Sequence, residues 1–385
     1  MPLITDTRAL AAFCDRMRQE RFVAVDTEFM RDRTYWPRLC LVQVAGEKEA
    51  VAIDALAPGI DLAPLLALMA DPAVLKVMHA ARQDLEIFHR LGQLPHPFFD
   101  TQVAAMVCGF GEEVAYETLV NKVAKAQLDK SSRFTDWARR PLTEAQIRYA
   151  LGDVTHLRVI YESLHARIEK AGRMGWVQEE LEALLDPRLY ENPPEEAWKR
   201  LKLRSRDGRF VAIVQALAAW REREAQRRDL PRARIIRDDL LLEVAANRPQ
   251  TVEELRSLER VSVDKEGAAA IVAAIREVMA LPRAALPQLP EPVVLPRGIG
   301  PIVDLLRVLL KYRCEEAEVA QRLVASTADL EAIAVDDRAD VPAMHGWRRE
   351  IFGEDALALK AGRLALAVRG RRPAVIRLEQ GTAAS

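Results

Sequence analysis

Two acidic residues stand two positions apart inside an otherwise apolar segment, Val25-Asp26-Thr27-Glu28-Phe29. Because side chains alternate along a strand, Asp26 and Glu28 leave it on the same face. Neighbouring carboxylates repel one another and are costly to bury unless protonation or a cation neutralises them. A divalent ion is the simplest partner, and a ligand set of oxygens suits Mg²⁺ or Mn²⁺ better than zinc. For an isolated Asp-x-Glu pair, a strand end with both acids facing water is the commoner arrangement.

A third acid, Asp84, follows the strand-like stretch Lys76 to His79 and precedes an amphipathic run. Alone, it is typical of the first turn of a helix, where the helix dipole favours a negative side chain. Asp100 precedes the helical pattern 101–108, and we interpret it as a helix N-cap outside the catalytic set.

The fourth acid, Asp153, lies four residues after Tyr149. On a helix this spacing places both side chains on one face, so the phenol reaches whatever the carboxylate binds. A tyrosine at such a site can orient an attacking water molecule. Tyr-x3-Asp on its own is weak evidence, because it occurs by chance in many helices.

Short apolar runs and helical patterns alternate over the first part of the chain. Segments 22–29, 39–44 and 50–53 predict strands, whereas 62–69, 82–91, 101–108 and 144–168 show helical periodicity. The order predicts a mixed sheet flanked by helices. From about residue 171 strand patterns nearly vanish, and five prolines separate two helical blocks. We therefore expect an α/β domain over 1–170, a helical connector over 171–205, helical domains over 206–281 and 299–370, a proline-rich linker over 282–298, and a flexible tail over 371–385.

Length and composition agree with several ordinary globular domains. The chain has 385 residues, which exceeds the roughly 250–300 that one hydrophobic core supports. Half of the residues are hydrophobic and 29% are charged, which excludes disordered and fibrous classes. We find no secretory signal or membrane span, and the four cysteines lack metal-ligand spacing, so we expect reduced thiols in a cytoplasmic protein.

The net charge of -1 argues neither for nor against a polyanionic partner. Between Trp198 and Leu240, however, thirteen Lys and Arg face six Asp and Glu, a surplus of seven positive charges. This stretch is a candidate surface for a phosphate backbone. A solvated helix face rich in Arg and Glu explains such a run equally well.

Taken in order, Asp26-x-Glu28, Asp84 and Tyr149-x3-Asp153 resemble the DEDD exonuclease superfamily in its tyrosine-bearing subclass. The flanking sequence narrows the resemblance to the ribonuclease D family over about residues 5–170. The stretches that carry it are DTEFMRDRTYWPRLCLVQV, HAARQDLEIF, FFDTQ and LDKSSRFTDWARRPLTEAQIRYALGDV. At the two positions before Asp153, where the family usually has small residues, this chain has Leu151 and Gly152.

The resemblance implies an α/β ribonuclease-H-like exonuclease domain in which the four acids hold two divalent ions, Mg²⁺ or Mn²⁺. Asp26 would bridge the ions, Glu28 and Asp153 would complete one shell, and Asp84 would reach the second ion. Tyr149 would align the attacking water, and nucleoside 5′-monophosphates would leave from a 3′ end. Cations and a histidine near these motifs are candidate substrate contacts: Arg31, Arg33, His79, Lys130 and Arg133.

The stretch from Arg209 to Leu258 resembles an HRDC domain, a small helical nucleic-acid-binding module. Its matching residues include Trp220, Arg221, Asp229 and Ile236. The segment GWRREIFGE resembles a degenerate second copy, so we expect two all-α HRDC-like domains after the exonuclease domain. The implied partner is RNA, with 3′ ends of transfer RNA precursors as the substrate class. A helical bundle that only closes the nuclease cleft remains the alternative.

Three other functions fit parts of the pattern. A 3′-to-5′ exonuclease acting on DNA would use the same carboxylates, but no polymerase or helicase region accompanies them. A non-catalytic RNA-binding protein would show loss of a metal ligand, whereas all four acids and Tyr149 are present. A phosphatase acting on small nucleotides would not need the large helical extension. The sequence thus favours a metal-dependent 3′-to-5′ exoribonuclease.

Overall fold

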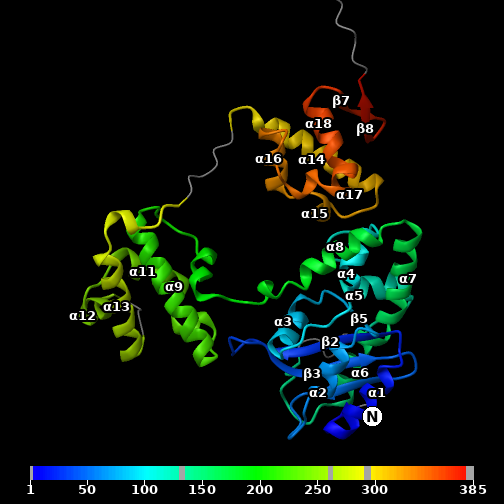
Figure 1. Ribbon diagram of the computed structural model, residues 1–385, viewed down its shortest axis with the longest axis horizontal. Helices are drawn as coiled ribbons and strands as arrows, with labels where there is room; N and C mark the ends of the chain where they lie inside the picture. The colour runs from blue at the N-terminus through cyan, green and yellow to red at the C-terminus, as the bar shows by residue number, and fades with distance from the viewer. Residues whose placement is uncertain (1–2, 130–134, 259–262, 290–295, 379–385) are drawn as a thin grey trace, which may run out of the picture.

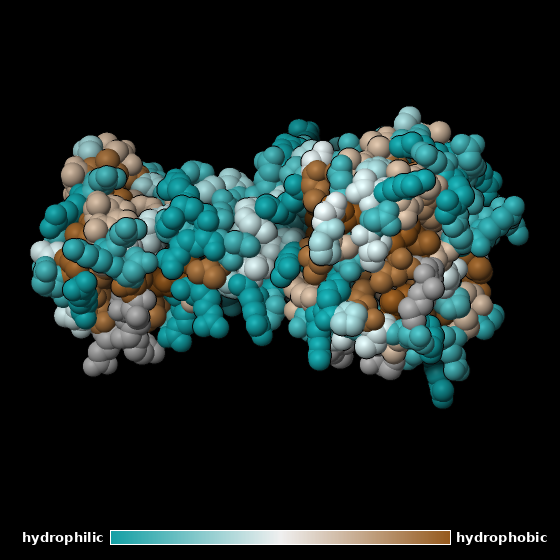
Figure 2. Space-filling view, turned by 90° about the horizontal axis from the view of Figure 1, so that it is seen from below, coloured by the Kyte–Doolittle hydropathy of each residue, from teal (hydrophilic) through white to brown (hydrophobic). Residues whose placement is uncertain are grey.

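The computed structural model describes residues 3–129, 135–258, 263–289 and 296–378. Figure 1 shows a mixed sheet with surrounding helices, a helical bundle to one side, and a third domain above the sheet domain. Seen from below in Figure 2, two lobes are joined by a narrower neck, and hydrophobic side chains gather on the larger lobe. Among the described residues, no helix combines the length and apolar character needed to cross a membrane.

The first domain, which we call the nuclease domain after the resemblance stated above, is built on a six-stranded sheet with the order β1-β4-β3-β2-β5-β6. The central strands β2, β3 and β4 are antiparallel, whereas β5 runs parallel to β2, and β6 runs parallel to β5. Their bounds are β1 Leu3–Ile4, β2 Phe22–Met30, β3 Arg38–Ala45, β4 Ala50–Asp54, β5 Leu75–Met78 and β6 Phe98–Asp100. The three predicted strands are therefore confirmed. The shorter strands are too brief to leave an alternating pattern.

Helices pack on both sides of this sheet. Leu10 and Phe13 of the first helix share a buried cluster with Val23 and Val25, while α6 packs on the opposite face over β2, β3 and β4. The predicted helix over 144–168 is interrupted at His156, which separates α6 from α7. The helices are α1 Thr7–Met17, α2 Ala63–Ala70, α3 Arg82–Arg90, α4 Thr101–Val107, α5 Tyr116–Leu119 with a π-helical turn Val120–Ala124, α6 Glu144–Thr155, α7 Leu157–Lys170 and α8 Met174–Leu184.

The second domain is a helical bundle with a hydrophobic core of its own. Its long helix α9 packs against α11 and α13, and short 3-10 helices, Pro187–Leu189 and Pro194–Arg200, lead into it from α8. The bundle comprises α9 Gly208–Arg228, α10 Arg232–Ile235, α11 Asp238–Asn247, α12 Val252–Ser257 and α13 Lys265–Ala280, followed by a 3-10 turn Arg283–Ala285.

The bundle contacts the nuclease domain through the loop that follows β2. The backbone N–H groups of Tyr35 and Trp36 donate to one oxygen of Asp229 at 3.1 and 3.0 Å. The Tyr35 hydroxyl donates to Glu222, whose carboxylate also accepts from Arg232 at 2.6 Å. The loop leaving the Asp26-Glu28 strand is thereby anchored on the end of α9.

The third domain corrects the expectation of an all-α block followed by a flexible tail. Its helices are α14 Ile299–Glu316, α15 Gln321–Val324, α16 Thr327–Val335, α17 Gly346–Arg348 and α18 Glu354–Lys360, with a 3-10 turn Pro342–Met344 and a π-helical turn Arg349–Gly353. A hairpin follows, β7 Leu364–Arg369 and β8 Arg372–Arg377, and β8 lies inside the expected tail 371–385. Gly370, with φ 64°, supplies the turn, and Leu366 and Val375 pack on the core.

This domain shares its hydrophobic core with the nuclease domain. The rings of Trp176 and Trp347 stack with centroids 4.4 Å apart. Arg348, only 9% exposed, donates to Glu179 at 2.6 Å, to the Leu323 carbonyl at 2.7 Å and to Glu180. Helix α8 is therefore held between the two domains.

Replacing this buried arginine tests how much the contact stabilises the chain. We expect Arg348→Ala to lower the free energy of unfolding by about 3 kcal/mol, because the largely buried Glu180 side chain and the Leu323 carbonyl lose their partner. Urea denaturation measures the loss. The neighbouring Arg349→Ala is the matched control, since Arg349 is 52% exposed and lies 3.9 Å from Glu354. Equal stability of both variants would contradict this account of the interface.

Candidate active site

Strand β2 brings Asp26 and Glu28 to one face, as the alternation predicts. In the antiparallel register Asp26 lies opposite Gln43, and Glu28 lies opposite Leu41. On its other edge β2 pairs with β5 only as far as Ala24. Beyond that point the edge of β2 is open to groups that approach from the carboxyl end of β5. Clefts in sheets of this type form at such strand ends.

Helix α6 brings Asp153 to the same place. Its start is fixed by a capping box, in which the Thr143 hydroxyl accepts from the backbone of Gln146 and the Gln146 side chain accepts from the backbone of Thr143. Ile147 and Ala150 then pack against the sheet. Ligand oxygens of Asp26, Glu28 and Asp153 all lie within 4.8 Å of one another. Acids from two distant segments thus converge on one point.

Asp84 reaches the site from the first turn of α3, and it is 7% exposed. The Thr27 hydroxyl, on β2 between the two acids, donates to its carboxylate. Asp84 is not one of the three acids within 4.8 Å, but its charge raises the pKa of Glu28. Its own pKa is raised well above the usual range by burial and by Asp26. The sequence-predicted acids therefore interact electrostatically.

Asp100 is confirmed as an N-cap. Its carboxylate accepts from the backbone of Gln102 at 2.7 Å at the start of α4. It also accepts from the backbones of Ala80 and Ala81 at 3.0 and 2.9 Å, just before α3 begins. Asp100 therefore holds in place the turn that delivers Asp84.

The electrostatics of the three clustered acids favour a cation. Burial, together with Asp153, raises the pKa of Asp26 well above its usual range. Burial and the neighbouring carboxylates raise the pKa of Glu28 to about 9, and burial raises that of Asp153 to about 7. Ionising all of them at neutral pH requires a positive partner. A cluster of carboxylate oxygens fits the oxygen ligation that Mg²⁺ and Mn²⁺ prefer.

Tyr149 and Asp153 line a cavity of about 190 Å³ together with Tyr116 and Leu128. The Tyr149 ring packs near Trp137, with centroids 6.1 Å apart. Sequence reasoning missed Tyr116, whose hydroxyl donates to the Gly152 carbonyl at 3.1 Å in the last turn of α6. Burial raises the pKa of this phenol far above its usual value, so it stays a donor. No local pattern marks Tyr116, because its role depends on a tertiary contact.

The candidate substrate contacts lie in different environments. The Arg33 side chain is 91% exposed and lies 3.4 Å from Asp32, whereas Arg31 pairs with Glu86 of α3 at 2.6 Å. Both ring nitrogens of His79 are engaged, with the Thr101 hydroxyl at 3.0 Å and the Val114 carbonyl at 3.1 Å. Lys130 and Arg133 lie outside the described residues. Among the candidates that the structure describes, Arg33 has the side chain most open to a substrate.

The raised pKa values make the stability of the metal-free protein depend on pH. Glu28 and Asp153 keep their protons in the folded chain up to pH values at which the unfolded chain has lost them. Their contribution to the free energy of unfolding is fully present at pH values below the ordinary carboxyl pKa. It is lost as the pH rises through the raised pKa values, about 7 for Asp153 and about 9 for Glu28. We expect the Tm in EDTA to fall from about pH 5 to about pH 9, and Mg²⁺ or Mn²⁺ to restore it most at the higher pH.

Thermal denaturation with and without metal measures this dependence. The Glu28→Gln chain is the control, and its Tm should fall less over the same range because one titrating group is gone. A Tm in EDTA that rises with pH in both chains would show that the acids are not held protonated by one another and by burial.

Comparison with known proteins agrees with this geometry. Residues 1–169 match the 3′-5′ exonuclease family model, and residues 211–270 match the HRDC domain model. The chain is 50% identical to ribonuclease D of Gluconacetobacter diazotrophicus, covering 96% of this chain and 95% of that one. It is 51% identical to ribonuclease D of Acidiphilium cryptum, covering 98% and 97% of the two chains.

Among solved structures, Escherichia coli RNase D, described as an exoribonuclease involved in structured RNA processing, superimposes with a TM-score of 0.80. The two chains are 32% identical, and the match covers 94% of this chain and 98% of that one. The acidic cluster, the exonuclease domain and these near full-length similarities together establish that the chain belongs to the ribonuclease D family.

Proposed function

We propose that this exonuclease domain removes nucleotides from the 3′ ends of RNA with the help of two divalent ions, releasing nucleoside 5′-monophosphates. Transfer RNA precursors are the proposed substrate class. The observation that carries the proposal is the convergence of Asp26, Glu28 and Asp153, with ligand oxygens within 4.8 Å of one another. Few other functions require like charges to be brought together out of water.

Each acid has a role in this proposal. Two divalent ions in such a site stabilise both the attacking and the leaving oxygen of an in-line displacement. Asp26 would bridge the ions, as the family resemblance implies, and it interacts electrostatically with both Asp153 and Asp84. Glu28 and Asp153 would complete the shell of one ion, and Asp84, oriented by Thr27, would face the second.

Tyr149 is the proposed group that orients the attacking water. Its phenol shares a cavity with Asp153, and it lies one helical turn earlier on α6. Tyr116 supports this arrangement by holding the end of the helix through the Gly152 carbonyl. The cavity would give the scissile phosphate a place next to both Asp153 and the phenol.

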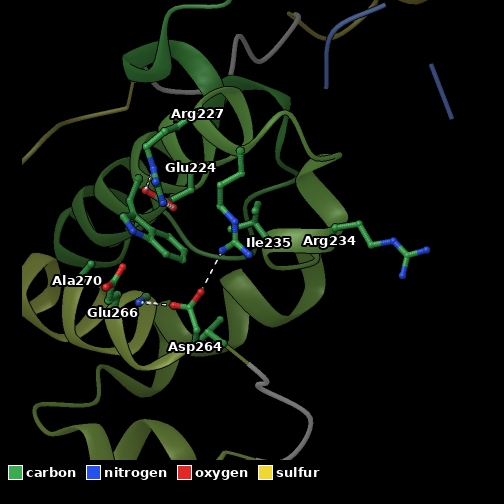
Figure 3. Close-up of a pocket in the computed structure, with 11 residues that line it drawn as sticks. Glu224, Arg227, Arg234, Ile235, Asp264, Glu266 and Ala270 are labelled. Carbon is green, nitrogen blue, oxygen red and sulfur yellow. Dashed lines mark hydrogen bonds and ion pairs between the residues drawn. The ribbon is translucent and has the colours of Figure 1, made fainter. Parts of the chain in front are cut away.

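The HRDC domain is proposed to bind RNA as a second surface beside the active site. Several arginines of its positive stretch are already in ion pairs, including Arg227 with Glu224 at 2.7 Å and Arg228 with Asp264 at 3.0 Å. These pairs line a cavity of about 290 Å³ beside Trp220. Arg234 also lines the cavity, but Figure 3 shows the end of its side chain extending away from the other labelled side chains, and within the described part of the chain it has no ion pair. Exposed arginines such as Arg234 are the candidates for salt-dependent phosphate contacts.

Two finer expectations belong to the same proposal. The third domain is proposed as a diverged second HRDC copy because the segment GWRREIFGE, which forms α17 and the following π-helical turn, resembles that family. A cytoplasmic location is proposed because all four cysteines are free and buried.

The competing functions predict different activities. A DNA exonuclease would degrade a DNA oligonucleotide at least as fast as the RNA of the same sequence. A non-catalytic RNA-binding protein would bind both without shortening either. The intact set of acids and Tyr149 favours an active enzyme, and the match to a ribonuclease D chain over nearly the whole length favours RNA.

The test is a time course on a transfer RNA precursor with a 3′ extension, with matched RNA and DNA oligonucleotides beside it. We expect stepwise shortening that stops in EDTA, a loss of about 10³-fold in Asp26→Asn and of about 10²-fold in Tyr149→Phe. Asp15→Asn, whose side chain is 69% exposed on α1, is the control and should be unaffected. Shortening that persists in EDTA or in Asp26→Asn would refute the metal mechanism, and faster degradation of DNA would refute the substrate.

A further inference from the structure

A buried glutamine next to the acidic cluster has no hydrogen-bond partner that would account for a polar side chain at its position. Gln43 of β3 is 0% exposed, and neither its amide nitrogen nor its carbonyl oxygen has a hydrogen-bond partner among the described residues. Most buried polar side chains are hydrogen-bonded, so such a group calls for an explanation. The adjoining residues of the strand, Val42 and Val44, are apolar and buried.

The position of Gln43 in the sheet identifies its neighbours. It lies directly opposite Asp26 on β2 and opposite Ala52 on β4. Residues paired in this way project from the same face, with Cβ atoms about 4.5–5.5 Å apart. The alanine methyl can form no hydrogen bond, and Ile147 and Ala150 of α6, which belong to the cluster packed on this face, are apolar.

Of the other acids near this face, Asp54 is already bound. Asp54 of β4, opposite Leu41 and therefore diagonal to Gln43, accepts from Arg140 at 2.5 and 2.7 Å and from the backbone of Leu56 at 2.9 Å. Glu28 lies further along β2, opposite Leu41, so Asp26, directly opposite Gln43, is the acid best placed to meet its amide. Its carboxylate has lone pairs beyond those that an ion would occupy.

We propose that Gln43 is a positioning residue for the bridging acid of the site: when divalent ions are bound, its amide nitrogen, unpaired in the metal-free chain, turns to donate to the Asp26 carboxylate and orients it toward the ions. The inference rests on the proposed metal site. An amide provides a donor without adding charge, whereas a lysine or arginine here would compete with the ions for Asp26. Hydrogen bonds of this kind to a ligating carboxylate fix its orientation and strengthen metal binding.

Gln43→Met tests the proposal, because methionine keeps the unbranched shape and removes both polar atoms. We expect the Tm of the metal-free chain to stay the same or rise, since a buried unpaired amide is removed. Mn²⁺ affinity, measured by calorimetry on the full chain, should fall about tenfold. The kcat on RNA should fall, while KM for RNA stays within twofold.

The matched control is Gln250→Met. Gln250 is a half-buried glutamine of the HRDC bundle, outside the acidic site, and its amide nitrogen donates to the Arg248 carbonyl at 3.0 Å. Its replacement should lower the Tm and leave Mn²⁺ affinity within twofold. A Gln43→Met chain with a lowered Tm and unchanged Mn²⁺ affinity would overturn the proposal, since it would make Gln43 a packing residue. If the unmodified chain itself bound no Mn²⁺, the proposed function would fail instead.

Discussion

Carboxyl groups of like charge are held close together and largely out of water, and the nuclease domain is arranged around that constraint. Without a cation, the observed geometry is tolerated only with protonated acids, as the raised pKa values of Glu28 and Asp153 indicate. With a cation, the same groups become ionised ligands. Metal binding and ionisation are therefore one coupled event, and the fold is organised so that the carboxyl groups do not move apart.

Each acid is held by a rigid element that strand pairing, helix capping or hydrogen bonds of its own keep in place. Asp26 and Glu28 belong to a central strand paired on both edges for part of its length. Asp153 lies on a helix with a capped start and an end held by Tyr116. Asp84 follows a turn bound by Asp100. The HRDC domain extends this support, since it binds the loop that leaves β2 at Tyr35 and Trp36.

Much of this arrangement could be predicted from the sequence, because the relevant periods are local. Strand alternation places Asp26 and Glu28 on one face, and helical spacing places Tyr149 beside Asp153. The contributions of Tyr116 and Gln43 could not be predicted in this way, because each depends on which residue lies opposite it in space. The hairpin that begins at Leu364 was not predicted, because its basic segment suggested a frayed C-terminal end. The surplus of positive charge after Trp198 was real, but many of its arginines are bound to acids, some of them from outside the stretch.

The central claim is that Asp26, Glu28, Asp153 and Asp84 surround divalent ions. Anomalous X-ray diffraction from crystals soaked in Mn²⁺ tests it most directly. The account predicts one manganese peak among the oxygens of Asp26, Glu28 and Asp153, and a second peak between Asp26 and Asp84. Manganese elsewhere on the chain, with none at the acidic cluster, would contradict it.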